Sequence, residues 1–354
     1  MEAKDALDKL IKKSRVHFYK PIQIAEILYH HRISNLNLDD LESYRNASKR
    51  WRDEVSIRLV GRKSTSSQKY QDNIFELNAI LPKLISILGK INKKSNGIVE
   101  TYIYKSLEKK LEIVHEVGKY ILNTSPKTFS LLELVALFKE NPGLKRSIDK
   151  IYEISVYALF STLVKALKAE VTLELGNIDK EIISDFGKFI NTVLGIDTNK
   201  TKVTIPAALY RVGVTNAADK GLDMWTNFGP AVQVKHLTLT SEIAEGISEE
   251  IYADKIIIVC LDAEKETIKT ILNQIGWSEK IQGIITLNDL DSWYKVCLSE
   301  KYKDNLGRDL LNYLINEFSL EFPSSEEIKP FLKERGYNNI VLTDEWTIND
   351  GHIF

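Results

Sequence analysis

Three residues of this sequence, Asp223, Gln233 and Lys235, have the side-chain types that a metal-dependent nuclease needs. A carboxylate and an amide are oxygen ligands that a hard divalent cation such as Mg²⁺ accepts. A lysine ammonium beside them is a fixed positive charge that can meet a phosphate. If the fold brings the three side chains together, they form a site suited to the hydrolysis of phosphodiesters.

The local sequence predicts how these residues are positioned. Residues 221–227 and 231–237 are predicted to be two strands, joined by a tight turn that contains glycine and proline. Because side chains alternate along a strand, Gln233 and Lys235 lie on one face, and the valines on either side of Gln233 point into the core. A hairpin of this length holds the Asp223 carboxylate near both side chains.

Each residue also has a simpler interpretation. Asp223 alone is explained by a strand end, and Lys235 alone by a solvent-facing position on an edge strand. The combination of an aspartate, a short turn and Gln-Val-Lys framed by valines arises by chance only occasionally, and it favours the catalytic interpretation. His236 points to the opposite face by the same alternation, so we interpret it as structural.

The composition is that of an ordinary globular protein. The chain has 354 residues, 44% of them apolar and 27% charged, which excludes a disordered chain and allows two domains. No apolar run is long enough for a membrane span, and the charged first residues contain no export signal, so we expect a cytoplasmic protein without membrane contact. The two cysteines, Cys260 and Cys297, lack metal-type spacing and are predicted to be inert core residues.

The charges are distributed unevenly along the chain. The formal net charge is −1, yet the first hundred residues hold 19 Lys and Arg against 12 Asp and Glu. The basic bias is strongest between Arg45 and Lys69, which is the predicted electrostatic footprint for a nucleic acid. The candidate DNA-contacting residues are Arg45, Asn46, Lys49, Arg50, Arg52, Arg62 and Lys63.

The basic segment is predicted to belong to a pair of helices. Residues 21–29 read as a short helix and residues 43–55 as a strongly basic one, which fits a helix-turn-helix that reads the major groove. A solvated basic helix face explains the same pattern equally well. Residues 61–67, with one glycine, four hydroxyl side chains and two cations, are suited to phosphate contact, although a plain surface loop is equally consistent.

The apolar periodicity divides the chain into two parts. Residues 3–173 have helical spacing, and after residues 176–177 the pattern changes to a helix, short extended segments, the hairpin and then alternating helix and strand. We therefore predict a helical, basic DNA-recognition region over residues 1–173 and a nuclease domain over residues 174–354. The predicted fold class is α/β, with a mixed sheet core flanked by helices. Its further elements are helices at 178–194, 266–275 and 289–298 and buried strands at 255–261 and 281–287.

The sequence resembles the PD-(D/E)xK nucleases, in the Mrr-like subgroup where glutamine replaces the second acid. Ala218-Asp-Lys-Gly-Leu-Asp223, followed by Gln233-Val-Lys235, is similar to their Asp…Gln-x-Lys signature. Over a longer stretch, which includes residues 12–21 and 46–53, the chain resembles the HaeII-type restriction endonucleases. The resemblance implies a restriction-endonuclease-like fold over nearly the whole chain.

The resemblance also implies an activity and its partners. The HaeII-type enzymes are type II restriction endonucleases: Mg²⁺-dependent homodimers that cut double-stranded DNA at purine-GCGC-pyrimidine. They act in a restriction system together with a cognate DNA methyltransferase. Asp223 and Gln233, with the Val234 backbone carbonyl, would hold the metal, and Lys235 would orient the attacking water. Because glutamine is neutral, a further carboxylate is expected; Glu174 and Glu181 are candidates, of which Glu174 is favoured, and the simpler interpretation is that both are surface charges.

Two alternatives remain open at this point. One is an Mrr-like, modification-dependent nuclease, which shares the chemistry and differs in its substrate. The other is a DNA-binding protein whose nuclease fold has lost activity, because a missing acid is how such folds decay. Cleavage of unmethylated DNA would argue against the modification-dependent nuclease. Mg²⁺-dependent cutting would argue against the inactive DNA-binding protein.

Overall fold

The computed structural model describes residues 2–64, 74–75, 79–176, 180–197, 200–212, 222–274, 276 and 279–349. The chain folds into two compact units. Unit 1 comprises the described residues up to Ile154 and those from Leu314 onward, and unit 2 comprises the described residues between Ser155 and Tyr313. No helix in these residues is long and apolar enough to cross a membrane.

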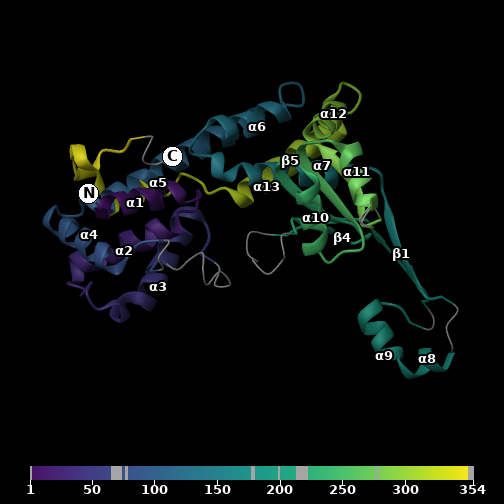
Figure 1. The fold of residues 1–354 in the computed structure, drawn as a ribbon, viewed down its shortest axis with the longest axis horizontal. Helices are drawn as coiled ribbons and strands as arrows, with labels where there is room; N and C mark the ends of the chain where they lie inside the picture. Colours follow the sequence, from purple (N-terminus) through teal and green to yellow (C-terminus); the bar gives the residue numbers. More distant parts are fainter. Residues whose placement is uncertain are drawn as a thin grey trace. The chain divides into compact units, whose positions relative to one another are not determined.

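The regular elements in the described part of unit 1 are helical, as its apolar spacing predicts (Figure 1). They are α1 Glu2–Lys13, α2 Tyr19–Ser34, α3 Leu41–Val60, α4 Pro82–Lys94, α5 Ile98–Asn123, α6 Leu131–Glu140, η1 Lys145–Ser147, the first part of α7 Ile148–Ala166, the last part of α13 Arg308–Glu321, α14 Ile328–Glu334, η4 Tyr337–Asn339 and η5 Asp344–Trp346.

A buried polar network ties these helices together around Glu100 on α5, whose side chain is fully buried. Its carboxylate accepts two bonds from the Arg32 guanidinium, at 2.9 and 2.7 Å, and one from the Tyr337 hydroxyl at 2.7 Å. Asn92 of α4 donates a further bond to the same carboxylate. A buried charge is tolerated when it is paired and hydrogen-bonded in this way, so the network fixes α2, α4 and η4 against α5.

Unit 2 is built on a five-stranded sheet of order β3-β4-β5-β6-β7 (Figure 1). The strands are β3 Leu209–Arg211, β4 Met224–Thr226, β5 Ala231–Leu239, β6 Ile256–Ala263 and β7 Ile281–Thr286. β4 is antiparallel to both of its neighbours, β3 and β5, whereas β5, β6 and β7 are parallel. The helical segments that follow the parallel strands are α10 Ser241–Glu250, α11 Lys265–Gln274, α12 Leu287–Leu298 and η3 Lys303–Gly307.

A second, two-stranded sheet of unit 2 forms the base of what we call the arm, the described residues of the range 170–206. β1 Glu170–Glu174 pairs antiparallel with β2 Lys202–Pro206. The short segments α8 Lys180–Asp185, α9 Gly187–Phe189 and the π-helical turn η2 Ile190–Leu194 lie between the two strands in the chain and at the far end of the ribbon in Figure 1.

The predicted fold class is confirmed: the protein is α/β, with a mixed sheet, flanking helices and a helical N-terminal region. The predicted buried strand at 255–261 is β6, which lies between β5 and β7. One expectation was wrong, because the helical pattern ends at Ala166 and residues 170–173 form a strand. The alternation of Val171 and Leu173 with polar residues is a period of two, which a helix cannot use. The predicted division near residue 174 concerns functional regions and stays a prediction.

Candidate active site

The predicted hairpin is present as β4 and β5. Met224 lies opposite Val232, and Trp225 lies opposite Ala231. Gly229 adopts a φ of 122°, a conformation that residues with a β-carbon rarely adopt, so a glycine is needed in this turn. β4 is shorter than predicted. Of the signature Ala218–Asp223, residues 218–221 lie outside the described part of the chain.

Asp223 lies directly beyond the end of the β4–β5 ladder, and its side chain contacts the second strand. Its Oδ2 accepts a hydrogen bond of 2.7 Å from the backbone N–H of Val234, the residue between Gln233 and Lys235. The structure therefore brings the carboxylate to the Gln-Val-Lys segment, as the sequence predicts. This bond orients the carboxylate group against the second strand.

Gln233 is buried, with 2% of its surface exposed, and no described residue donates a hydrogen bond to its Oε1 atom. A buried acceptor without a partner is rare, because it forfeits about 1–3 kcal/mol relative to a hydrated one. It therefore points to a ligand that satisfies it. An amide oxygen and a carboxylate are together a donor set that fits a hard divalent cation such as Mg²⁺.

Lys235 lies on β5 two residues beyond Gln233 and is half-buried. Gln233 pairs with Ile258 and Lys235 with Cys260, so both side chains lie on the sheet face where Ile258 and Cys260 pack against α10 and α11. The shared face agrees with the predicted alternation. The regular pairing of β5 with β6 is interrupted just after Lys235, between that residue and Thr238. Such bulges often redirect side chains next to active sites.

The face of β5 opposite Gln233 and Lys235 differs in one respect from the prediction that both valines point into the core. Val232 is fully buried, as predicted, but Val234 is only half-buried. Periodicity predicts which face a side chain takes and cannot predict where the covering helices end. His236, also half-buried, lies in the interrupted stretch, where simple alternation no longer determines its direction.

Two residues that the sequence analysis did not single out lie beside the site. Tyr210 on β3 and Trp225 on β4 are directly opposite each other, and their rings stack with centroids 4.2 Å apart. Both remain 43–46% exposed. Trp225 follows Asp223 by two residues, which is the only signal the sequence offers. Exposed aromatic rings are suited to contact with nucleic-acid bases or sugars.

Glu174, the predicted additional ligand, lies at the outer end of β1. Its carboxylate is 3.7 Å from the Lys202 ammonium, and both side chains are more than half exposed. This pair belongs to the two-stranded sheet, which is separate from the sheet that carries Gln233. The structure therefore does not bring Glu174 to Asp223, and the described residues contain no group of three or more His, Cys, Asp or Glu side chains placed to hold a metal.

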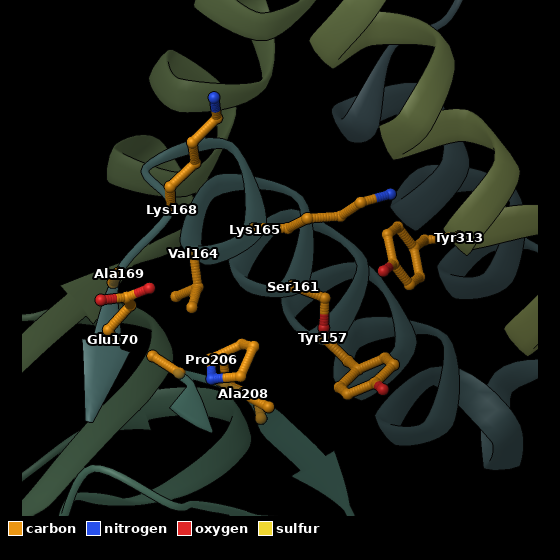
Figure 2. Close-up of a pocket in the computed structure, with 12 residues that line it drawn as sticks. Tyr157, Ser161, Val164, Lys165, Lys168, Ala169, Glu170, Pro206, Ala208 and Tyr313 are labelled. Carbon is orange, nitrogen blue, oxygen red and sulfur yellow. The ribbon is translucent and has the colours of Figure 1, made fainter. Parts of the chain in front are cut away.

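Both cysteines are buried core residues, as predicted. Burial raises the pKa of the Cys260 thiol to about 11, so it stays protonated and is a poor metal ligand. A cavity of about 390 Å³ lies between α7, α13 and the base of the arm (Figure 2). Its lining includes Lys165 and Lys168 but none of the three site residues, so it is distinct from the candidate site.

The candidate DNA-contacting residues lie mainly on α3. α2 packs against α3, which continues to Val60, so the basic helix is longer than predicted. Asn46, Lys49 and Arg50 are exposed on α3, and Lys63 is exposed just beyond it. These four residues remain available to a phosphate backbone. The second half of the predicted loop, residues 65–67, lies outside the described part of the chain.

The three remaining arginines of the predicted footprint make contacts within the protein. Arg52 is buried, with 5% of its surface exposed, and its guanidinium pairs with Asp53 at 2.7 Å. Arg62 donates to the backbone carbonyls of Leu320 and Glu321. Arg45 pairs with Glu42 at 3.0 Å. We therefore leave Arg52 out of the DNA-contact surface, because a buried, paired guanidinium cannot reach DNA without breaking its ion pair.

Comparison with known proteins gives consistent results. The family described as HaeII restriction endonuclease matches residues 3–337. The chain is 50% identical to the type II restriction enzyme HaeII of Haemophilus aegyptius, over 96% of this chain and 97% of that protein. It is 49% identical to the type II restriction enzyme NgoBI of Neisseria gonorrhoeae, over the same shares of the two chains. No solved structure is significantly similar. The chain belongs to the HaeII restriction endonuclease family.

Proposed function

We propose that the protein is a type II restriction endonuclease that uses Mg²⁺ to hydrolyse double-stranded DNA at purine-GCGC-pyrimidine. The observation that carries this proposal is that the Val234 N–H holds the Asp223 carboxylate, while the preceding residue, Gln233, has a buried Oε1 atom that no described residue satisfies. Membership of a restriction endonuclease family supports it, as do the names of the two relatives. A methyltransferase of the same specificity would protect the host DNA.

The chemistry is divided among few groups. Asp223 and Gln233, with the backbone carbonyl of Val234, would hold the cation. When bound, Mg²⁺ supplies Lewis-acid chemistry that polarises the phosphoryl oxygens. Lys235 provides a positive charge that orients the attacking water and stabilises the charge that develops on the phosphate. Val234 has a second role, since its N–H holds the Asp223 carboxylate in place.

A digest tests the proposal. On unmethylated plasmid DNA with Mg²⁺, we expect discrete fragments whose sequenced ends all map to purine-GCGC-pyrimidine. EDTA should abolish cleavage, and a matched plasmid with the central GCGC changed at every site should stay intact. Cleavage of methylated DNA alone would instead support a modification-dependent nuclease. Duplex binding without any Mg²⁺-dependent cutting would support an inactive DNA-binding protein.

The exposed basic residues of α3 should contribute to DNA binding. The double variant Lys49→Ala/Arg50→Ala should bind the duplex more weakly and lower the slope of log affinity against log salt by up to about 2, because each lost phosphate contact removes about 0.9. Fluorescence anisotropy in Ca²⁺ over a salt series measures the affinity for the duplex and its dependence on salt. The control is Lys90→Ala/Lys94→Ala on α4, which removes the same charge from two other exposed positions. Equal changes in the two double variants would contradict the assignment to α3.

A further inference from the structure

The arm has an apolar face that nothing in the described chain covers. In the ribbon, Val171 pairs with Ile205 and Leu173 with Val203, and directly opposite residues of an antiparallel pair share a face. Leu173 is 43% exposed and Ile205 46%. A two-stranded ribbon with one apolar face is marginally stable by itself, so it needs a surface to pack against.

The helical segments of the arm carry a second apolar surface. Ile182 lies in α8, Phe186 in the turn that follows it, Phe189 in α9 and Val193 in η2, at intervals of four, three and four residues. All four are 51–60% exposed, whereas Ile190 in the same segment is buried. Monomeric proteins rarely expose contiguous apolar patches of this kind, which usually mark an interaction site.

We infer that the arm is the surface through which a second copy of this chain pairs with it. The spacing of the stripe reads the same in both directions, so two antiparallel copies match Ile182 with Val193 of the partner subunit and Phe186 with Phe189 of the partner subunit. A two-fold interface is self-complementary in this sense. This inference rests on the proposed function, in which two identical subunits read a palindromic site.

The charge and the area of the arm favour a protein over DNA. Residues 170–206 contain six acidic and four basic side chains, a balance that phosphates repel. The exposed apolar side chains offer of the order of 500 Å² per subunit, compared with about 800 Å² per partner in a standard interface. Pairing through the ribbon and the stripe together therefore supplies most of the apolar core of a stable dimer.

Sedimentation velocity tests the inference. We expect the wild type to sediment as a dimer, and Phe186→Glu/Phe189→Glu to weaken the dimer at least a hundredfold without changing the circular dichroism spectrum. Leu122→Glu/Leu320→Glu is the control, because it adds the same charge at two exposed leucines of unit 1 and should leave the dimer intact. A dimer that survives the arm substitutions, or a wild type that stays monomeric with and without duplex, overturns the inference.

A cross-link provides a second test that does not depend on a disruptive variant. Both native cysteines are buried, so engineered thiols can be oxidised selectively. Ile182→Cys and Val193→Cys are made as two separate single variants and mixed, so that no internal disulfide between the two positions can form. Antiparallel pairing predicts a disulfide-linked dimer after mild oxidation. A dimeric protein that forms no such cross-link contradicts this geometry.

The same proteins should be assayed for plasmid cleavage with Mg²⁺, which separates the two proposals. If the wild type cuts DNA and the arm variant remains dimeric, the arm is not the dimer interface, and the proposed function is retained. If the wild type dimerises through the arm and never cuts DNA, the arm is the dimer interface, and the proposed endonuclease function is wrong.

Discussion

Replacing Asp223 with asparagine should lower the rate of DNA cleavage at least about a thousandfold, because charge stabilisation by a bound metal supplies several kcal/mol and each 1.36 kcal/mol is tenfold in rate. Asparagine keeps an oxygen that can accept the Val234 N–H bond, so the hairpin should survive while the negative charge is lost. Lys235→Ala should lower the rate by about a hundredfold to a thousandfold, as the loss of a group that stabilises developing charge does.

Single-turnover cleavage in Mg²⁺ measures both losses, and duplex binding in Ca²⁺ should remain measurable in each variant. The matched controls are Asp254→Ala and Lys269→Ala, which remove the same charges at exposed positions of unit 2. Wild-type activity in either site variant would exclude this site. A loss shared equally by the controls would show a general effect of charge.

Gln233→Leu should make the protein more stable and less active at the same time. Leucine has a similar volume and no acceptor, so the variant removes a buried oxygen that has no donor in the described structure. The melting temperature without metal should rise by a few degrees, since relief of such a group is worth about 1 kcal/mol or more. Cleavage should fall about a hundredfold, because one oxygen ligand of the metal is lost.

Gln233→Glu provides the complementary result. A buried carboxylate without a cation should lower the melting temperature in EDTA, and Mg²⁺ should restore more stability in this variant than in the wild type. Differential scanning calorimetry with and without Mg²⁺ measures both variants. If Gln233→Leu is less stable than the wild type, the Gln233 amide stabilises the fold through contacts within the protein, and its oxygen is not an unsatisfied acceptor. If Gln233→Leu cleaves at the wild-type rate, Gln233 is not a ligand.

Local sequence patterns predict much of the fold, because the relevant forces act over a few residues. The turn around Gly229 and the alternating residues after it determine a hairpin, and the run of β-branched residues around Ile258 determines a strand buried on both faces. The contact of Asp223 with the Gln-Val-Lys segment follows from the hairpin, so this part of the candidate site could also be predicted.

Other features depend on residues that are distant in the sequence. Arg52 appears as one more basic residue in a charged run, and only the packing of α2 against α3 shows that it is buried beside Gln23. Glu174 lies a few residues before the predicted helix at 178–194, yet the residues that follow form the arm, and the pairing of β1 with β2 carries Glu174 into a separate sheet. The Tyr210–Trp225 stack requires the pairing of β3 with β4, which neither strand specifies alone.

A crystal structure of the protein with its duplex and Mn²⁺, with the cation located by its anomalous scattering, tests the convergence of Asp223, Gln233 and Lys235 most directly. We expect an anomalous peak bonded to the Asp223 carboxylate and to Gln233 Oε1, with the Lys235 ammonium facing the same phosphate. A cation bound elsewhere, with Gln233 Oε1 accepting a hydrogen bond from the protein and Lys235 turned away from the DNA, would contradict it.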